Sequence, residues 1–208
     1  SITGHPDGTA GGGAMKVGVA LVDVLTGLYA ANAIQAALHH RNVTQKGQAI
    51  DISLLDCLAA SLANQSMNYL VTGDSPNRMG NDHPSIVPYG VFKASDEEFI
   101  LAVGNDGQFQ AMCAAAGTSE IAAQPEYATN SERVKNRDAL KAVLADVFVR
   151  KTAKDWLDVL EKAGVPCGPV NDIGAALNHP QIQARGMVQA RQHETLGEIP
   201  VVSNPINL

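Results

Sequence analysis

The first part of the chain consists of long runs of apolar and small residues. Residues 17–41 are apolar or small at nearly every position, which predicts a helix that is buried on all sides. Residues 48–53 alternate polar and apolar side chains, as a half-buried strand does, and residues 54–71 are rich in alanine and leucine. The pattern therefore predicts a helix-strand-helix unit within residues 1–72.

Two segments lack any periodic pattern. Residues 4–14 are rich in glycine, and their spacing favours a flexible connector. Residues 73–89 (GDSPNRMGNDHPSIVPY) form a long irregular segment, and loops of this length are usually functional or disordered. This second segment is predicted to be either a linker between domains or a loop over an active site.

The rest of the chain alternates short strand and helix patterns, which predicts a small α+β domain over residues 90–190 and a return segment over residues 191–208. The expected elements are strands at 90–93 and 98–103, helices at 106–116, 131–149 and 152–163, an extended segment at 165–170, short helices at 172–177 and 180–185, and paired strands at 188–192 and 199–202.

Charge and cysteine content exclude several classes of protein. The net charge is −6 and no basic run exceeds a pair of residues, which argues against a nucleic-acid binder. Cys57, Cys113 and Cys167 lie far apart, so neither a disulfide framework nor a CxxC metal site is expected, and a reducing, cytoplasmic setting is the default. Polar residues interrupt the longest apolar stretches, so no membrane-spanning segment is expected. Both ends look cut, which suggests a piece of a longer chain.

Asp23 is the most unusual residue for chemistry. It is the only acid between Asp7 and Asp51, and it lies inside the apolar run VGVALVDVLTG. One interpretation is an N-cap, since aspartate is favoured at the start of a helix. The other is a carboxylate nucleophile, kept ionised by the helix dipole and shielded from water. The sequence pattern leaves both open, whereas Asp51 and Asp56 are expected to be a turn residue and a cap.

Four stretches carry a resemblance to a known family: VGVALVDVLTGLYA at 17–30, residues 36–56 ending in GQAIDISLLD, residues 68–73 with GNDHPSIVPYG at 80–90, and Trp156 with AGVPCGPV at 163–170. In this order they resemble the family III CoA transferases. The resemblance implies an α+β / α/β fold, in which the end of a Rossmann-like large domain is followed by a small α+β domain. It also implies that family members are about twice this long.

The resemblance assigns roles as well. Asp23 matches the aspartate that attacks an acyl-CoA thioester, giving an aspartyl anhydride and then an aspartyl-CoA thioester. Asn81, His83 and Tyr89 lie in the loop that covers the active site and are candidate contacts for the acyl group. The implied partners are an acyl-CoA, a small carboxylic acid and a second copy of the chain in a homodimer. Coenzyme A is a substrate, and neither a permanently bound cofactor nor a metal is implied.

Two alternatives remain open at this point. In related racemases an aspartate at the position of Asp23 acts as an acid or base together with an upstream histidine, although the GNDHPSIVPY stretch favours transfer. The chain could also be a catalytically incompetent fragment that acts only as a folding or association module.

Overall fold

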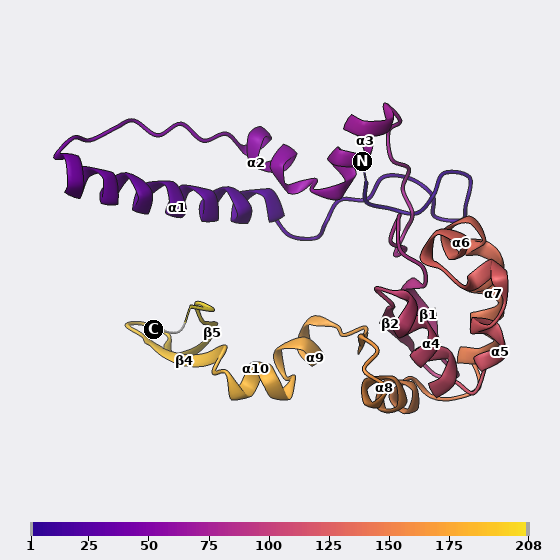
Figure 1. Cartoon of the computed structure of the whole chain (residues 1–208). Coiled ribbons are helices and arrows are strands. Elements are labelled where there is room, and N and C mark those ends of the chain that lie inside the picture. Colours follow the sequence, from indigo (N-terminus) through magenta and orange to yellow (C-terminus); the bar gives the residue numbers. More distant parts are fainter. Residues whose placement is uncertain (1, 207–208) are drawn as a thin grey trace. The chain divides into compact units, whose positions relative to one another are not determined.

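We describe residues 2–206 in a computed structural model of the chain. The chain divides into two compact units, Ser1–Pro84 and Ser85–Leu208. Figure 1 shows the elements of both units, coloured along the sequence.

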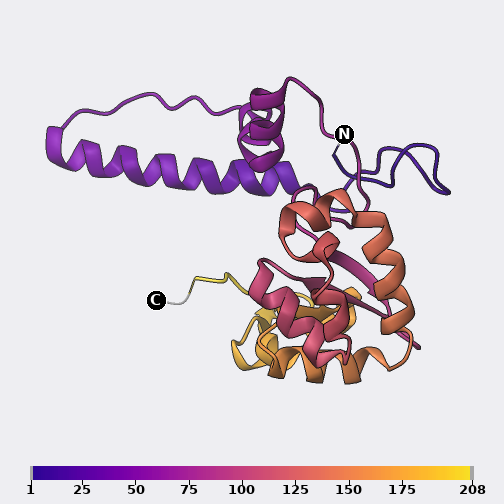
Figure 2. The same cartoon turned by 45° about the vertical axis from the view of Figure 1, so that its right-hand side comes forward.

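The described part of the first unit, residues 2–84, contains the helices α1 (Leu21–Thr44), α2 (Leu54–Ser61) and α3 (Asn64–Thr72). Figures 1 and 2 both show the chain leaving the end of α1 as an extended segment that runs back to α2. α1 begins at Leu21, later than expected, and ends at Thr44, where the left-handed backbone of Gln45 follows. None of its residues is buried, so the predicted all-round burial is wrong for this chain.

Two expected elements of this unit differ in the structure. Residues 48–53 form no strand, because they have no strand partner among the described residues, and an extended segment needs one to satisfy its backbone. The predicted helix 54–71 is two helices. The break lies at Ala63, whose φ of 47° is outside the helical range.

The glycine-rich loop is not the free connector that its composition favours. The amide of Gly13 donates to His5 O at 3.3 Å, and the amide of Gly80 donates to Gly4 O at 3.0 Å. Arg78 also pairs with Asp7. Gly4 has a φ of 121°, and a Cβ there would lie 2.0 Å from the carbonyl oxygen of Gly13. Glycine is therefore required at this position for the loop to close on itself.

The second unit is built on an antiparallel sheet of order β1-β2-β3, with Tyr89 opposite Ala102 in the first pair. A separate hairpin pairs Val188 with Val202, as predicted. The elements of this unit are β1 (Tyr89–Lys93), β2 (Glu98–Ala102), α4 (Asp106–Ala115), α5 (Ser119–Ala122), η1 (Pro125–Tyr127), α6 (Asn130–Lys135), α7 (Arg137–Phe148), α8 (Ala153–Lys162), β3 (Cys167–Pro169), α9 (Ile173–Leu177), α10 (Pro180–Ala184), β4 (Val188–His193) and β5 (Gly197–Val202).

An aromatic cluster fills the core of the second unit. Phe148 meets Phe92, Phe99 and Trp156 edge to face, with ring centroids 5.2, 5.1 and 5.2 Å apart. The indole N–H of Trp156 donates to Phe148 O at 2.7 Å, so this fully buried side chain leaves no polar atom unpaired. Trp156 is thus a packing residue of this core.

Caps explain where the helices of this unit begin and end. Thr152 Oγ1 accepts a hydrogen bond from the Asp155 amide at 3.2 Å, which confirms the predicted start of α8. The single helix expected at 131–149 is wrong, because the chain breaks at Asn136 between α6 and α7. The side chain of Asn136 donates to the carbonyls of Glu126 and Glu132 and so competes with continued helix.

One helix among the described residues, α1, is long and apolar enough to cross a membrane, with a hydropathy of 1.3. The expectation that no segment of the chain could qualify is therefore too strict. A core helix of a soluble protein has the same length and composition, so this feature alone does not indicate a membrane.

Candidate active site

Asp23 lies in the first turn of α1, as the third residue of the helix. The N-cap position is held by Ala20, so the interpretation of Asp23 as the cap is wrong. The amides of a first helical turn have no helical acceptor and favour a negative charge nearby. The side chain is exposed in this chain, so the shielding from water expected for a nucleophile is not provided by the described residues.

The loop residues 80–89 join the two units. Asn81 is exposed in the turn that follows Gly80, whose φ is 62°, and His83 is half-buried. Both belong to the unit that contains Asp23. Tyr89 belongs to the second unit, where it is the first residue of β1 and 38% exposed. The assignments of Asn81, His83 and Tyr89 as substrate contacts stay predictions.

The far end of this loop is held by two residues that the sequence pattern does not single out, Asn130 and Arg133. The side-chain oxygen of Asn130 accepts from the amide of Val87 at 3.1 Å, and Arg133 Nε donates to Val87 O at 2.7 Å. The guanidinium of Arg133 is fully buried and also donates to Tyr127 O at 3.0 Å. The loop therefore ends on a fixed support within the second unit.

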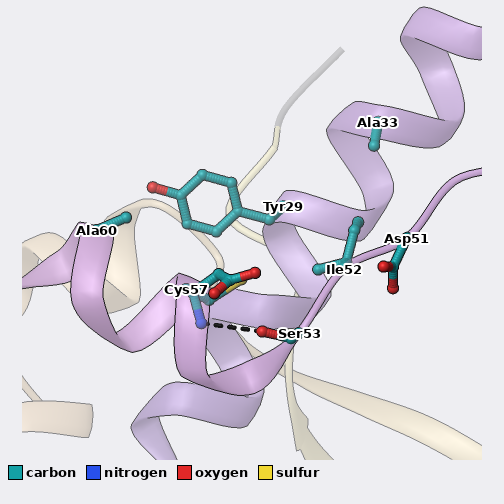
Figure 3. Close-up of a pocket in the computed structure, with 8 residues that line it drawn as sticks. Tyr29, Ala33, Asp51, Ile52, Ser53, Cys57 and Ala60 are labelled. Atoms are coloured by element: carbon teal, nitrogen blue, oxygen red, sulfur yellow. Dashed lines mark hydrogen bonds between the residues drawn. The ribbon is translucent and has the colours of Figure 1, made fainter.

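A pocket of about 310 Å³ opens between α1 and α2 in the first unit (Figure 3). Its floor is the start of α2, where Ser53 Oγ accepts from the amide of Asp56 at 3.0 Å. The cap of this helix is thus Ser53, and the predicted cap role of Asp56 is wrong. The lining residues are Tyr29, Ala33, Asp51, Ile52, Ser53, Asp56, Cys57 and Ala60.

No group of three or more His, Cys, Asp or Glu side chains within residues 2–206 is arranged to hold a metal ion. The three cysteines are free thiols, and burial raises the pKa of Cys113 to about 11. A thiol with so high a pKa is a poor nucleophile at neutral pH. The pKa of Cys113 therefore argues against this thiol as a nucleophile.

The amino-acid sequence matches the model of "CoA-transferase family III" over residues 1–208. The chain belongs to this family. The family III chain is 45% identical over 206 residues to "Succinate--glutarate CoA-transferase" of Agrobacterium fabrum, an alignment that covers 99% of this chain and 50% of that protein. It is 39% identical to "Acetyl-CoA:oxalate CoA-transferase" of Acetobacter aceti, covering 99% of this chain and 51% of that protein.

Solved structures confirm the family III fold. A CAIB/BAIF family protein from Brucella suis is 45% identical with a TM-score of 0.77, covering 100% of this chain and 52% of that one. Rv3272 from M. tuberculosis is 20% identical with a TM-score of 0.83, covering 96% of this chain and 52% of that one, and shows the fold alone. The predicted mixed α and β architecture is confirmed, and the chain spans about half the length of the curated relatives it matches.

Proposed function

We propose that this chain contributes the nucleophile and the small domain of an enzyme that transfers coenzyme A between carboxylic acids. Membership of CoA-transferase family III over the whole chain carries this proposal. Two curated relatives, by their names, act as CoA-transferases on succinate and glutarate, or on acetyl-CoA and oxalate. Succinate, glutarate and oxalate are dicarboxylic acids, so a small dicarboxylic acid is the proposed acceptor, and the CoA thioester of a small carboxylic acid is the proposed donor.

In the proposed mechanism a carboxylate oxygen of Asp23 attacks the thioester carbon of the acyl-CoA. The carbon–sulfur bond breaks, a mixed anhydride forms and CoA leaves as a thiolate. The thiolate then attacks the aspartyl carbonyl, which releases the donor acid and leaves an aspartyl-CoA thioester. The acceptor carboxylate attacks this thioester, giving a second anhydride and free thiolate. Attack of the thiolate on the acceptor's carbonyl yields the new acyl-CoA and restores Asp23.

The position of Asp23 supports this role. It lies in the first turn of α1, where the backbone amides lack helical acceptors and favour a negative charge nearby. The same steps consume no electrons and need no Lewis acid. We therefore propose that the enzyme uses CoA thioester as a substrate and no permanently bound cofactor.

We also propose that the protein works as a homodimer. The helices of the first unit expose large apolar side chains, including Leu28 of α1 (57% exposed), Leu55 of α2 (73%) and Val71 of α3 (78%). Apolar surface of this kind drives association. A cytoplasmic location is proposed as well, because the three cysteines are free thiols. Light scattering that finds a monomer at tens of micromolar would overturn the dimer.

The test of function compares two aspartates in equivalent positions. Asp23 and Asp56 each lie in the first turn of a helix in the same unit, and both are exposed. In an active full-length protein that contains residues 1–208, Asp23→Asn should abolish CoA transfer from succinyl-CoA to a dicarboxylic acid, whereas Asp56→Asn should not. Substantial CoA transfer by the Asp23→Asn variant would rule out Asp23 as the nucleophile. Exchange of the α-proton of the acyl-CoA by the wild type, without any transfer of CoA, would instead favour a racemase.

A further inference from the structure

The carboxyl end of the 80–89 loop is bound through its backbone by one side chain of α6. The Asn130 oxygen Oδ1 accepts from the amide of Val87 at 3.1 Å, and its Nδ2 donates to Ser85 O at 2.8 Å. These two bonds flank Ile86 in the way that a neighbouring strand would pair with it. Both act on main-chain atoms, so the contact fixes the path of the loop and not the identity of its side chains.

Neighbouring contacts fix the next residues in the same way. Arg133 Nε donates to Val87 O at 2.7 Å, and the amide of Val103 donates to Pro88 O at 3.0 Å. Val87 is buried, and Tyr89 follows directly as the first residue of β1. The position of the loop's last residues is therefore set from α6 and from the end of β2.

We propose that Asn130 is a positioning residue for the reaction: it fixes the backbone at the end of the 80–89 loop and so the position of Tyr89, the candidate contact for the carboxylic acid substrate. This inference rests on the proposed function. Asn130 is better suited to this role than to supporting the core, because it is half-exposed and both hydrogen bonds of its side chain shown in the structure go to the loop. Arg133, in contrast, is fully buried and serves the core and the loop together.

A matched control lies six positions further along the chain. The side chain of Asn136 also makes hydrogen bonds with two backbone groups, the carbonyls of Glu126 at 3.1 Å and Glu132 at 3.0 Å, and neither belongs to the loop. Asn130→Ala and Asn136→Ala therefore remove similar bonds from the same helical region. Only Asn130→Ala should disturb the backbone of the 80–89 loop.

The first measurement is amide hydrogen exchange on residues 1–208, resolved at Val87. Asn130→Ala should speed exchange at Val87 about tenfold, since a hydrogen bond of ordinary strength is lost there. Asn136→Ala should leave it unchanged. Asn130→Asp keeps the acceptor for the Val87 amide and loses the donor to Ser85, so its exchange should lie between wild type and Asn130→Ala. Unchanged exchange of the Val87 amide in Asn130→Ala would overturn the proposal. If Asn130→Ala does not fold, Asn130→Asp takes its place, and unchanged exchange of the Val87 amide in that variant would overturn the proposal.

The second measurement is steady-state kinetics in the active full-length protein. Asn130→Ala should lower kcat/KM for the acceptor acid about tenfold or more, because misplaced contacts cost rate steeply, and should leave the KM for acyl-CoA unchanged. Equal losses in Asn130→Ala and Asn136→Ala, or faster exchange without a kinetic effect, would refute a positioning role. Absence of transferase activity in the wild type would instead refute the proposed function, and the exchange result would still report on the loop.

Discussion

Replacing Arg133 by methionine tests what stabilises the second unit. The guanidinium is fully buried, donates to Val87 O and Tyr127 O, and lies 4.4 Å from the centre of the Phe109 ring. Methionine keeps most of the apolar stem but leaves both carbonyls without their donor. An unsatisfied buried polar group costs ~1–3 kcal/mol, and loss of the cation–π contact adds ~1 kcal/mol. We expect Arg133→Met to lower the free energy of unfolding by about 4 kcal/mol.

The ion pair with Asp106 should contribute little by comparison. Arg133 Nη2 lies 2.8 Å from Asp106 Oδ1, but the Asp106 side chain is 50% exposed and water can replace the contact. Asparagine at position 106 keeps a side-chain oxygen that can accept from Nη2, so only the charge of the half-exposed partner is lost, which contributes ~0–1 kcal/mol. Asp106→Asn should therefore destabilise the unit by less than about 1 kcal/mol.

Urea unfolding followed by tryptophan fluorescence measures both variants. Trp156 is the one tryptophan in the sequence and lies in the core of the second unit, so its signal reports on that unit. With a slope of about 2 kcal/mol/M, Arg133→Met should shift the midpoint down by about 2 M. Arg133→Lys, which retains one donor group, should fall between. Equal shifts for Arg133→Met and Asp106→Asn would show that the charge pair, and not the carbonyls, carries the stabilisation.

Two further predictions concern titrating groups. Hydrogen bonds from the amides of Ala153 and Glu97 lower the pKa of Asp96, so its stabilising effect is present above the ordinary aspartate pKa and is lost as pH falls through the lowered value. The stability difference between wild type and Asp96→Asn, measured by urea unfolding, should thus shrink below about pH 4, and a difference that grows there would contradict this assignment. Burial raises the pKa of Cys113 to about 11, so iodoacetamide at mildly alkaline pH should modify this thiol only after the protein is denatured. Mass spectrometry measures the labelling. Rapid labelling of the folded protein would show that the thiol is accessible and would contradict this prediction.

Elements with a local signal were predictable from the sequence. Thr152 begins α8 with a side-chain cap, and the strands around residues 194–197 pair as their alternation indicates. The breaks at Ala63 and Asn136 were not predictable. Neither glycine nor proline marks Ala63, and the Asn136 side chain acts partly through Glu126, which lies outside the helix. Residues 48–53 alternate like a strand, but alternation does not supply the partner that a strand requires.

The residues of the candidate site also differ in whether the sequence alone could identify them. Asp23 stands out in the sequence because it is a single acid in a long apolar run, and this signal is local. Asn130 and Arg133 contact residues 45 and 46 positions away, at Ser85 and Val87, and such contacts leave no mark on local periodicity. A weak signal existed for Arg133, which shares a helical face with Leu140 and Leu144 when residues 131–149 are drawn as one helix.

Isotope transfer to Asp23 tests the central claim most directly. Trypsin should release residues 17–41 as one peptide, because Lys16 and Arg41 bound it, and Asp23 is its only acidic side chain. In the proposed mechanism the acceptor carboxylate supplies the bridging oxygen of the second anhydride, and that oxygen stays on Asp23 when the thiolate takes the acyl group. Turnover of an active full-length protein with acceptor acid labelled in its carboxylates with a heavy oxygen isotope should therefore add the label to this peptide. Efficient turnover that leaves the peptide unlabelled would contradict the account.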